Sequence, residues 1–219
     1  KSAYQKMAFY KAMQLYSNND AYRANEYLDK ALIYKNDQAL EALSYFWKAD
    51  IAHKYERYDE SNQWLAQFNA LAFTISTSTD SRVSSGMGDY IQAYNSYKKS
   101  DFISSQILFT KAINRLKNEN DAVVLQTIYP DAILRLADSY YMQKKYAEAL
   151  GQYQKVIQMN AKGADYGWYQ AGMLSGFQGD VNTKISSLSK VFQNFKNSTY
   201  ADDALFELGN TYSSLDRSQ

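Results

Sequence analysis

Residues that could do chemistry are few in this sequence and lie far apart. The only histidine is His53, and a general base needs a nucleophile and an orienting acid beside it, which the sequence does not place. Cysteine is absent, which excludes disulfides and thiolate metal sites, and a single histidine leaves only carboxylates as metal ligands. We therefore expect no catalytic site, no metal and no cofactor.

Two short motifs have both a chemical and a structural interpretation. Asp202 and Asp203 could form a paired carboxylate, but adjacent helical residues point about 100° apart and do not converge on one proton or ion. In a first helical turn they instead interact favourably with the helix dipole, with Ser198 or Thr199 as the cap. The stretch "GMGDY" at 86–90 lacks the preceding strand and third glycine of a dinucleotide loop. Both motifs are expected to be structural.

The composition favours helices and excludes several classes of partner. One proline and nine glycines in 219 residues are too few for an all-β fold with many tight turns. The net charge of +1 comes from interspersed acids and bases, so no nucleic-acid partner is expected. No apolar run reaches the roughly 18 residues that span a bilayer, so we expect no direct membrane insertion of this segment.

Helical periodicity extends over almost the whole chain. Apolar residues recur at three- and four-residue steps in blocks separated by short polar breaks. The breaks lie at 17–20, 54–57, 98–101, 143–145 and 177–180. Because each break falls between two helical blocks, the pattern predicts a series of helix-turn-helix pairs.

The clearest pair is "YPDAILRLADSYYMQKKYAEALGQYQKVIQMN". Small residues at Ala137 and Ala149 would let the two helices approach closely, with tyrosines and leucines filling the space around that contact. This unit resembles the tetratricopeptide repeat. The family's positions are held here by Ile133, Leu136, Ala137, Tyr140, Tyr146, Ala149 and Tyr153, while Val156 replaces the last alanine. Tyr140, Tyr146 and Tyr153 are accordingly expected in the core.

The same frame recurs downstream and, more weakly, upstream. Gly172 lies 35 residues after Ala137, and Gly209 follows in frame on the closing segment. Lys184 and Ser175 depart from the pattern, so this hairpin is expected to pack more loosely. Upstream, three segments match a second helix of the repeat: 21–32, 58–68 and 102–113.

The resemblance implies an all-α, right-handed superhelical tetratricopeptide solenoid of about five helix-turn-helix hairpins plus a trailing helix. We expect a single array over 1–219, with approximate repeats 2–36, 37–72, 84–117, 130–162, 164–196 and 200–215. Two insertions interrupt it: 73–86 is expected to be a loop, and 118–129 to hold an extra helical turn. The closing "YADDALFELGNTYSSL" has no second helix after it, which predicts a fragment of a longer protein.

A second set of residues falls outside the packing frame, on the face of the first helices that lines the concave groove in the resembled family. The set comprises Leu134, Asp138, Tyr141, Tyr169, Met173, Phe177, Phe206 and Asn210, with Arg135 and Gln170 at the rim. Aromatic and methionine side chains offer adaptable apolar contact area for an extended or helical peptide. The hypothesis is a partner-binding groove, and the alternative is burial of this face by a terminal cap or a neighbouring helix.

These features predict a non-catalytic scaffold that binds a protein or peptide in the concave groove. Two alternatives stay open: a structural spacer module of a large cell-envelope protein, and a carbohydrate-uptake-associated binding component, which would need aromatics exposed on loops. Segments 164–180 and 195–212 are similar to long multi-repeat tetratricopeptide proteins of the Bacteroidetes envelope. That similarity implies a periplasmic or outer-membrane-associated location, with the cytoplasm as the alternative.

Overall fold

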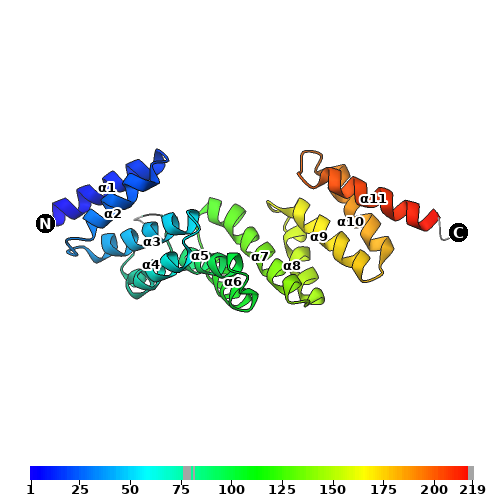
Figure 1. Ribbon diagram of the computed structural model, residues 1–219, viewed down its shortest axis with the longest axis horizontal. Helices are drawn as coiled ribbons and strands as arrows, with labels where there is room; N and C mark the ends of the chain where they lie inside the picture. Colours follow the sequence, from blue (N-terminus) through cyan, green and yellow to red (C-terminus); the bar gives the residue numbers. More distant parts are fainter. Residues whose placement is uncertain (76–79, 81, 217–219) are drawn as a thin grey trace. The chain divides into compact units, whose positions relative to one another are not determined.

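The computed structural model describes residues 1–75, 80 and 82–216, and within them the regular structure is helical, with no β-strand (Figure 1). The chain divides into two compact units, 1–121 and 122–219. The first holds α1 (Ser2–Ser17), α2 (Ala21–Ala31), α3 (Gln38–Lys54), α4 (Tyr58–Leu71), α5 (Ser85–Lys98) and α6 (Phe102–Leu116). The second holds α7 (Tyr129–Met142), α8 (Tyr146–Gln158), α9 (Ala164–Phe177), α10 (Val181–Asn194) and α11 (Ala201–Asp216).

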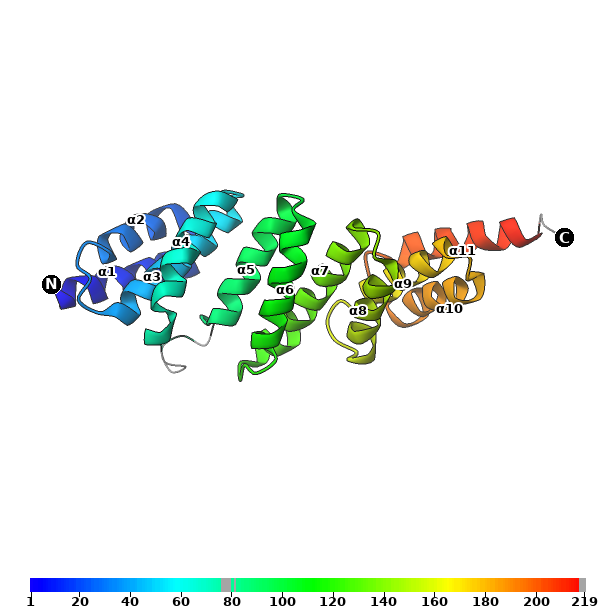
Figure 2. The same cartoon turned by 90° about the horizontal axis from the view of Figure 1, so that it is seen from below.

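Consecutive helices pack as antiparallel pairs, as Figures 1 and 2 show for α1 with α2 and for α9 with α10. We call the first helix of each pair the A helix and the second the B helix; α11 packs on α10 and stands where the next A helix would. The prediction of an all-α repeat fold with five hairpins and a trailing helix is confirmed. The repeat boundaries and the continuity of the array stay predictions.

The five hairpin turns share one backbone geometry. Each contains one residue with positive φ, namely Asn19, Glu56, Ser100, Lys144 or Gly179. The amide after it donates to a carbonyl five residues back, for example Asp20 to Leu15 at 2.9 Å and Asp180 to Ser175 at 2.9 Å, which ends the first helix in a Schellman-type cap. In three turns an aspartate then caps the second helix through its side chain. All five turns lie at the predicted polar breaks.

The two inserted segments differ in structure. Residues 118–129 contain a π-helical segment, η2 (Val124–Ile128), that runs directly into α7, which confirms the extra helical turn. The segment 73–86 is helical at both ends: the 3-10 turn η1 (Ala72–Thr74) extends into its start, and α5 begins at Ser85. The remainder of the expected loop includes 76–79 and 81, which lie outside the described residues.

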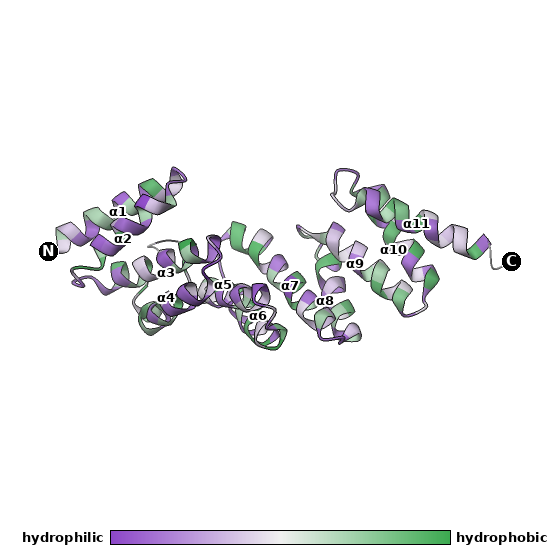
Figure 3. Cartoon of the chain, in the orientation of Figure 1, coloured by the Kyte–Doolittle hydropathy of each residue, from purple (hydrophilic) through white to green (hydrophobic). Residues whose placement is uncertain are grey.

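Each helix carries both hydrophobic and hydrophilic residues, as the colouring of Figure 3 shows, so each buries one side in its unit. In the first unit the core contains large aromatic side chains, among them Phe46, Trp47 and Phe68. In the second unit it consists mainly of small and aliphatic residues such as Ala137, Ala149 and Leu188. Tyr153 is buried there as predicted, whereas Tyr140 and Tyr146 are only half-buried.

Candidate functional site

The predicted groove residues of the second unit divide into exposed and interior side chains. Tyr141, Phe177 and Phe206 are 43%, 72% and 68% exposed, although each is a large apolar ring. Tyr169 and Met173 are partly covered, because they pack on a small cluster that joins α10 to α11. Gln170 is half-buried and Asn210 is exposed. The A helices α7, α9 and α11 therefore present aromatic side chains to solvent; we call this surface the A-helix face.

Leu134 and Asp138 lie in the interior of the second unit. Leu134 packs beneath Gly163, where φ is +87° and an added Cβ would lie 2.6 Å from the leucine Cδ1. The left-handed backbone and this close contact both require glycine at that position. Leu134 thus fixes the connection between α8 and α9.

Asp138 is the centre of a polar network. It is only 5% exposed, and its Oδ1 accepts hydrogen bonds from the hydroxyls of Tyr153 at 2.6 Å and Tyr166 at 2.9 Å. Its Oδ2 accepts from Arg135 at 2.5 Å. Burial raises the pKa of Asp138, and the Arg135 charge and the two hydroxyls oppose that rise. The network links α7, α8 and α9 and positions the Tyr166 ring.

Arg135 is held by charges on its own helix. Its Nε contacts Asp131 at 3.3 Å, one turn back, and its guanidinium lies 5.4 Å from the centre of the Tyr166 ring. This distance is within the range of a cation–π interaction. Arg135, predicted at the rim of the groove, is therefore part of the Asp138 network.

Three tyrosines form a stack beside this network. The rings of Tyr166 and Tyr200 are 5.1 Å apart, and those of Tyr169 and Tyr200 are 5.4 Å apart and nearly parallel. Burial raises the pKa of Tyr169, and the charges of Asp203 and Glu207 add to the rise. Burial also raises the pKa of Tyr200; the charge of Arg135 opposes this rise, and the charges of Asp165 and Asp203 add to it. The stack thus lies near several carboxylates and the Arg135 guanidinium.

A second aromatic group lies at the other end of the same A helices. The Tyr146 ring contacts Tyr141 at 5.6 Å and Phe177 at 5.2 Å between ring centres. Both contacts join the carboxyl end of an A helix to the first residue of α8. Aromatic pairs in such arrangements keep their rings in place at little entropic cost on binding.

Sequence reasoning missed Tyr166, Tyr200 and Asp203 as members of this surface. Tyr166 stands three residues before Tyr169, so helical spacing was a usable signal for it. Tyr200 lies just before α11, where only the three-dimensional structure shows that its ring reaches α9. Ser198, predicted as a cap, accepts from the Tyr200 amide and donates to Asp165 at 2.6 Å, which fixes this entry to α11.

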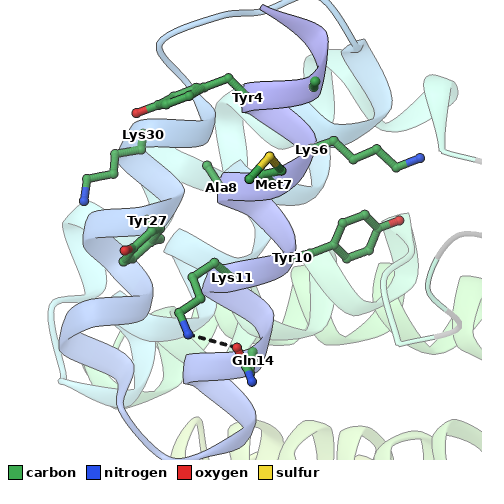
Figure 4. A pocket seen from close by; sticks show the side chains of 10 residues that line it. Tyr4, Lys6, Met7, Ala8, Tyr10, Lys11, Gln14, Tyr27 and Lys30 are labelled. Carbon is green, nitrogen blue, oxygen red and sulfur yellow. Dashed lines mark hydrogen bonds between the residues drawn. The ribbon is translucent and has the colours of Figure 1, made fainter.

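The first unit has a different open surface, a groove of about 870 Å³ between α1 and α2 (Figure 4). Met7 and Tyr10 on this surface are 73% and 57% exposed. The charged residues that line it are lysines: Lys6, Lys11 and Lys30. The Lys11 ammonium donates a hydrogen bond to Gln14 Oε1 at 3.0 Å, which is drawn as a dashed line in Figure 4. This groove is therefore apolar and basic.

The remaining chemical candidates have structural roles. His53 Nδ1 lies 2.7 Å from Asn95 Oδ1, and the Asn95 amide donates to Ser61 and Asn62, so these side chains join α3, α4 and α5. Gly88 of the "GMGDY" stretch faces Phe68, since a Cβ there would lie 2.8 Å from its ring. No group of three metal-binding side chains occurs among the described residues. No helix in the described ranges is long and apolar enough to cross a membrane.

Comparison with known proteins identifies the repeat. Residues 131–162 match the family model of the tetratricopeptide repeat. No curated protein matches the chain. Among solved structures, YrrB, a tetratricopeptide-repeat protein with an unusual peptide-binding site, aligns with 19% identity and a TM-score of 0.66, over 90% of this chain and 89% of its own. MamA aligns with 16% identity and a TM-score of 0.65, over 85% and 95% of the two chains.

The type IV pilus biogenesis factor PilW aligns with 13% identity and a TM-score of 0.51, over 92% of this chain and 98% of its own. Alignments at such low sequence identity show a similar fold and nothing more. Residues 131–162 are therefore a tetratricopeptide repeat, and the chain has the helical-repeat fold of tetratricopeptide-repeat proteins.

Proposed function

We propose that this chain is a non-catalytic interaction scaffold that holds a peptide, or an extended segment of a partner protein, on the A-helix face of its second unit. The observation that carries the proposal is the exposure of Tyr141, Phe177 and Phe206, at 43%, 72% and 68%. Their helices bury other apolar residues in the core, so these three rings are not needed to hold the fold. Rigid exposed aromatics are typical anchors of protein interfaces.

The fold supports the same proposal. Helical-repeat proteins use extended surfaces built from successive repeats to bind partners, and YrrB, which has a similar fold, has a peptide-binding site. In the second unit the Asp138 network and the Tyr146 contacts fix the rings before a partner arrives. A pre-organised surface loses less conformational entropy on binding.

The test is selection of peptides from a random display library on the full chain. We expect enriched sequences with aromatic or aliphatic side chains, and we expect Phe206→Ala and Phe177→Ala each to weaken their binding about tenfold, as for the loss of one anchor. Phe192→Ala is the matched control, because Phe192 is 43% exposed but lies on α10, a B helix. If no peptide is enriched, or if Phe192→Ala weakens binding as strongly, the proposal is wrong and a spacer role is favoured.

We also propose a periplasmic or outer-membrane-associated location. The proposal rests on the similarity of 164–180 and 195–212 to tetratricopeptide proteins of the Bacteroidetes envelope. Osmotic-shock fractionation of cells that produce the native protein tests it. Release with a periplasmic marker, or recovery with outer membranes, is expected, and co-fractionation with a cytosolic marker would contradict it.

A further inference from the structure

The A helices of the two units carry opposite charge. In the second unit, α7, α9 and α11 together hold seven acidic residues and one basic residue, Arg135. In the first unit, α1, α3 and α5 hold three acidic and five basic residues. The surface on which we place the partner is therefore acidic as well as aromatic, and a partner with complementary charge would be attracted to it.

Arg135, the one basic residue in the described helices α7, α9 and α11, is already neutralised. Arg135 forms ion pairs with both Asp131 and Asp138 while its guanidinium lies against the Tyr166 ring. This arrangement is an internal example of what the surface accommodates: a planar cation between a tyrosine face and a carboxylate.

The neighbouring tyrosine pair lies beside a carboxylate, Asp203, that no cation of the described residues holds in an ion pair. Tyr169 and Tyr200 stack at 5.4 Å, and the charge of Asp203 raises the pKa of both hydroxyls, whereas that of Arg135 lowers the pKa of Tyr200. Asp203 is exposed and has no ion-pair partner among the described residues. Glu207, which also acts on Tyr169, is held at 2.8 Å by Lys184, so its charge is partly compensated. Asp203 is thus the carboxylate available to a ligand.

We propose that the partner segment is basic, and that one of its arginine or lysine side chains lies against Tyr169 and Tyr200 with its charge facing Asp203. This inference rests on the proposed function, since it names the chemistry of the peptide on that same face. Exposed apolar rings at Phe177 and Phe206 hold the neutral part of the segment, and the tyrosine pair with its carboxylate selects the charge. Specificity by charge and affinity by aromatic contact are separable on such a surface.

The experiment compares three fluorescent peptides on the full chain, equal in length and apolar content, with arginine, serine or glutamate at the same positions. We expect the arginine peptide to bind at least about tenfold more tightly than the serine peptide, and the glutamate peptide to bind more weakly still. Added salt weakens the arginine peptide most, because exposed charges are screened.

Two matched variants locate the effect. Asp203→Asn is expected to weaken the arginine peptide about threefold to fivefold and to leave the serine peptide unchanged. Asp202→Asn removes the same charge from the same helical turn, but Asp202 points about 100° away and should change neither. Equal effects of the two variants would mean that the peptide responds to the overall negative charge of the helix, and would overturn the assignment of its cation to Asp203.

Two different outcomes distinguish an error in this inference from an error in the proposed function. If the three peptides bind equally and all lose affinity with Phe206→Ala, the face binds peptides without selecting charge, and only the inference is wrong. If no peptide binds and the display library also yields none, the proposed function itself is wrong.

Discussion

The two units place their aromatic side chains differently although both consist of helical hairpins. Six aromatic residues are buried in the described part of the first unit, from Phe9 to Phe109, whereas Tyr153 alone is buried in that of the second. Buried alanines and closely packed glycines occur in both units, for example Ala49 and Gly88 in the first and Ala137 and Gly172 in the second. At Gly172, an added Cβ would lie 3.0 Å from Leu188 Cγ. The difference lies in the buried rings, because exposed rings occur in both units, among them Tyr10 and Tyr22 in the first and Phe177 and Phe206 in the second.

The difference in buried rings coincides with the part of the sequence that matches the repeat model. Residues 131–162, which match the repeat model, belong to the unit with few buried aromatic rings. The core of the first unit contains rings such as Phe46 and Phe68, 5.3 Å apart, and its sequence matches the repeat pattern more weakly. The same fold is therefore stabilised with many buried aromatic rings in the first unit and with few in the second.

Truncating a buried ring should show this difference most strongly. Phe68 is fully buried in the first unit and contacts Phe46, so we expect Phe68→Ala to lower the free energy of unfolding by about 3–5 kcal/mol. Phe206→Ala in the second unit removes an exposed ring and should change it by less than about 0.5 kcal/mol. Urea unfolding followed by circular dichroism measures both. Similar losses would contradict the placement of aromatics described here.

Asp50 should make the stability of the first unit depend on pH. Burial raises the pKa of its side chain to about 6, against the opposing charges of His53 and Arg82. A carboxyl group with a higher pKa in the folded state prefers to be protonated there, so the free energy of unfolding falls as pH rises from about 4 to about 6. We expect Asp50→Asn to remove a decline of up to about 3 kcal/mol, measured by urea unfolding across this range.

The control for this pH effect is Asp59→Asn. Asp59 is 79% exposed at the side chain, and its ion pair with Lys99 is open to solvent. Its removal should leave the slope of stability against pH unchanged. Parallel profiles for the wild type and Asp50→Asn would show that Asp50 has an ordinary pKa in the folded protein.

The hairpins were predictable from sequence because their signals are local. Apolar spacing and polar breaks placed the helices and all five turns, and Pro130 lies in the first turn of α7. The positive φ of Asn19, Glu56, Ser100 and Lys144 was not foreseen, because none of these turns contains glycine there. The Schellman hydrogen bonds stabilise a conformation that residue type alone disfavours.

The candidate site was predictable only in part. Helical spacing placed Tyr141, Phe177 and Phe206 outside the packing frame, and they are exposed. The same spacing grouped Asp138 with them, yet Asp138 is buried because Tyr153 and Tyr166 reach it from two other helices. Such contacts depend on side chains separated by 15 and 28 residues along the chain, which no single-helix pattern contains.

Buried carboxylates of the two units should respond differently to removal. Asp138→Ala leaves the hydroxyl of buried Tyr153 without its acceptor, so we expect a loss of about 2–3 kcal/mol in the free energy of unfolding. Asp89→Ala should cost less, about 1–2 kcal/mol, because its partners Lys111 and Arg115 have side chains 47% and 45% exposed and can turn to water. Chemical denaturation of the two variants tests the order. A larger loss for Asp89→Ala would show that the first unit depends more on its buried charge.

Replacing one glycine in each unit by alanine should change the free energy of unfolding least, and with opposite sign in the two units. Gly209, inside α11, has no heavy atom within 4 Å of an added Cβ, whereas at Gly88 in α5 a Cβ would lie 2.8 Å from the Phe68 ring. Alanine loses less conformational entropy than glycine in a helix, so Gly209→Ala should raise the free energy of unfolding by about 0.5–1 kcal/mol. Gly88→Ala gains the same propensity but must displace a fully buried ring in a tightly packed core, and we expect net destabilisation. Stabilisation by both variants, in urea unfolding, would mean that Phe68 can move and that the aromatic core of the first unit is less tightly packed than the contacts at Gly88 indicate.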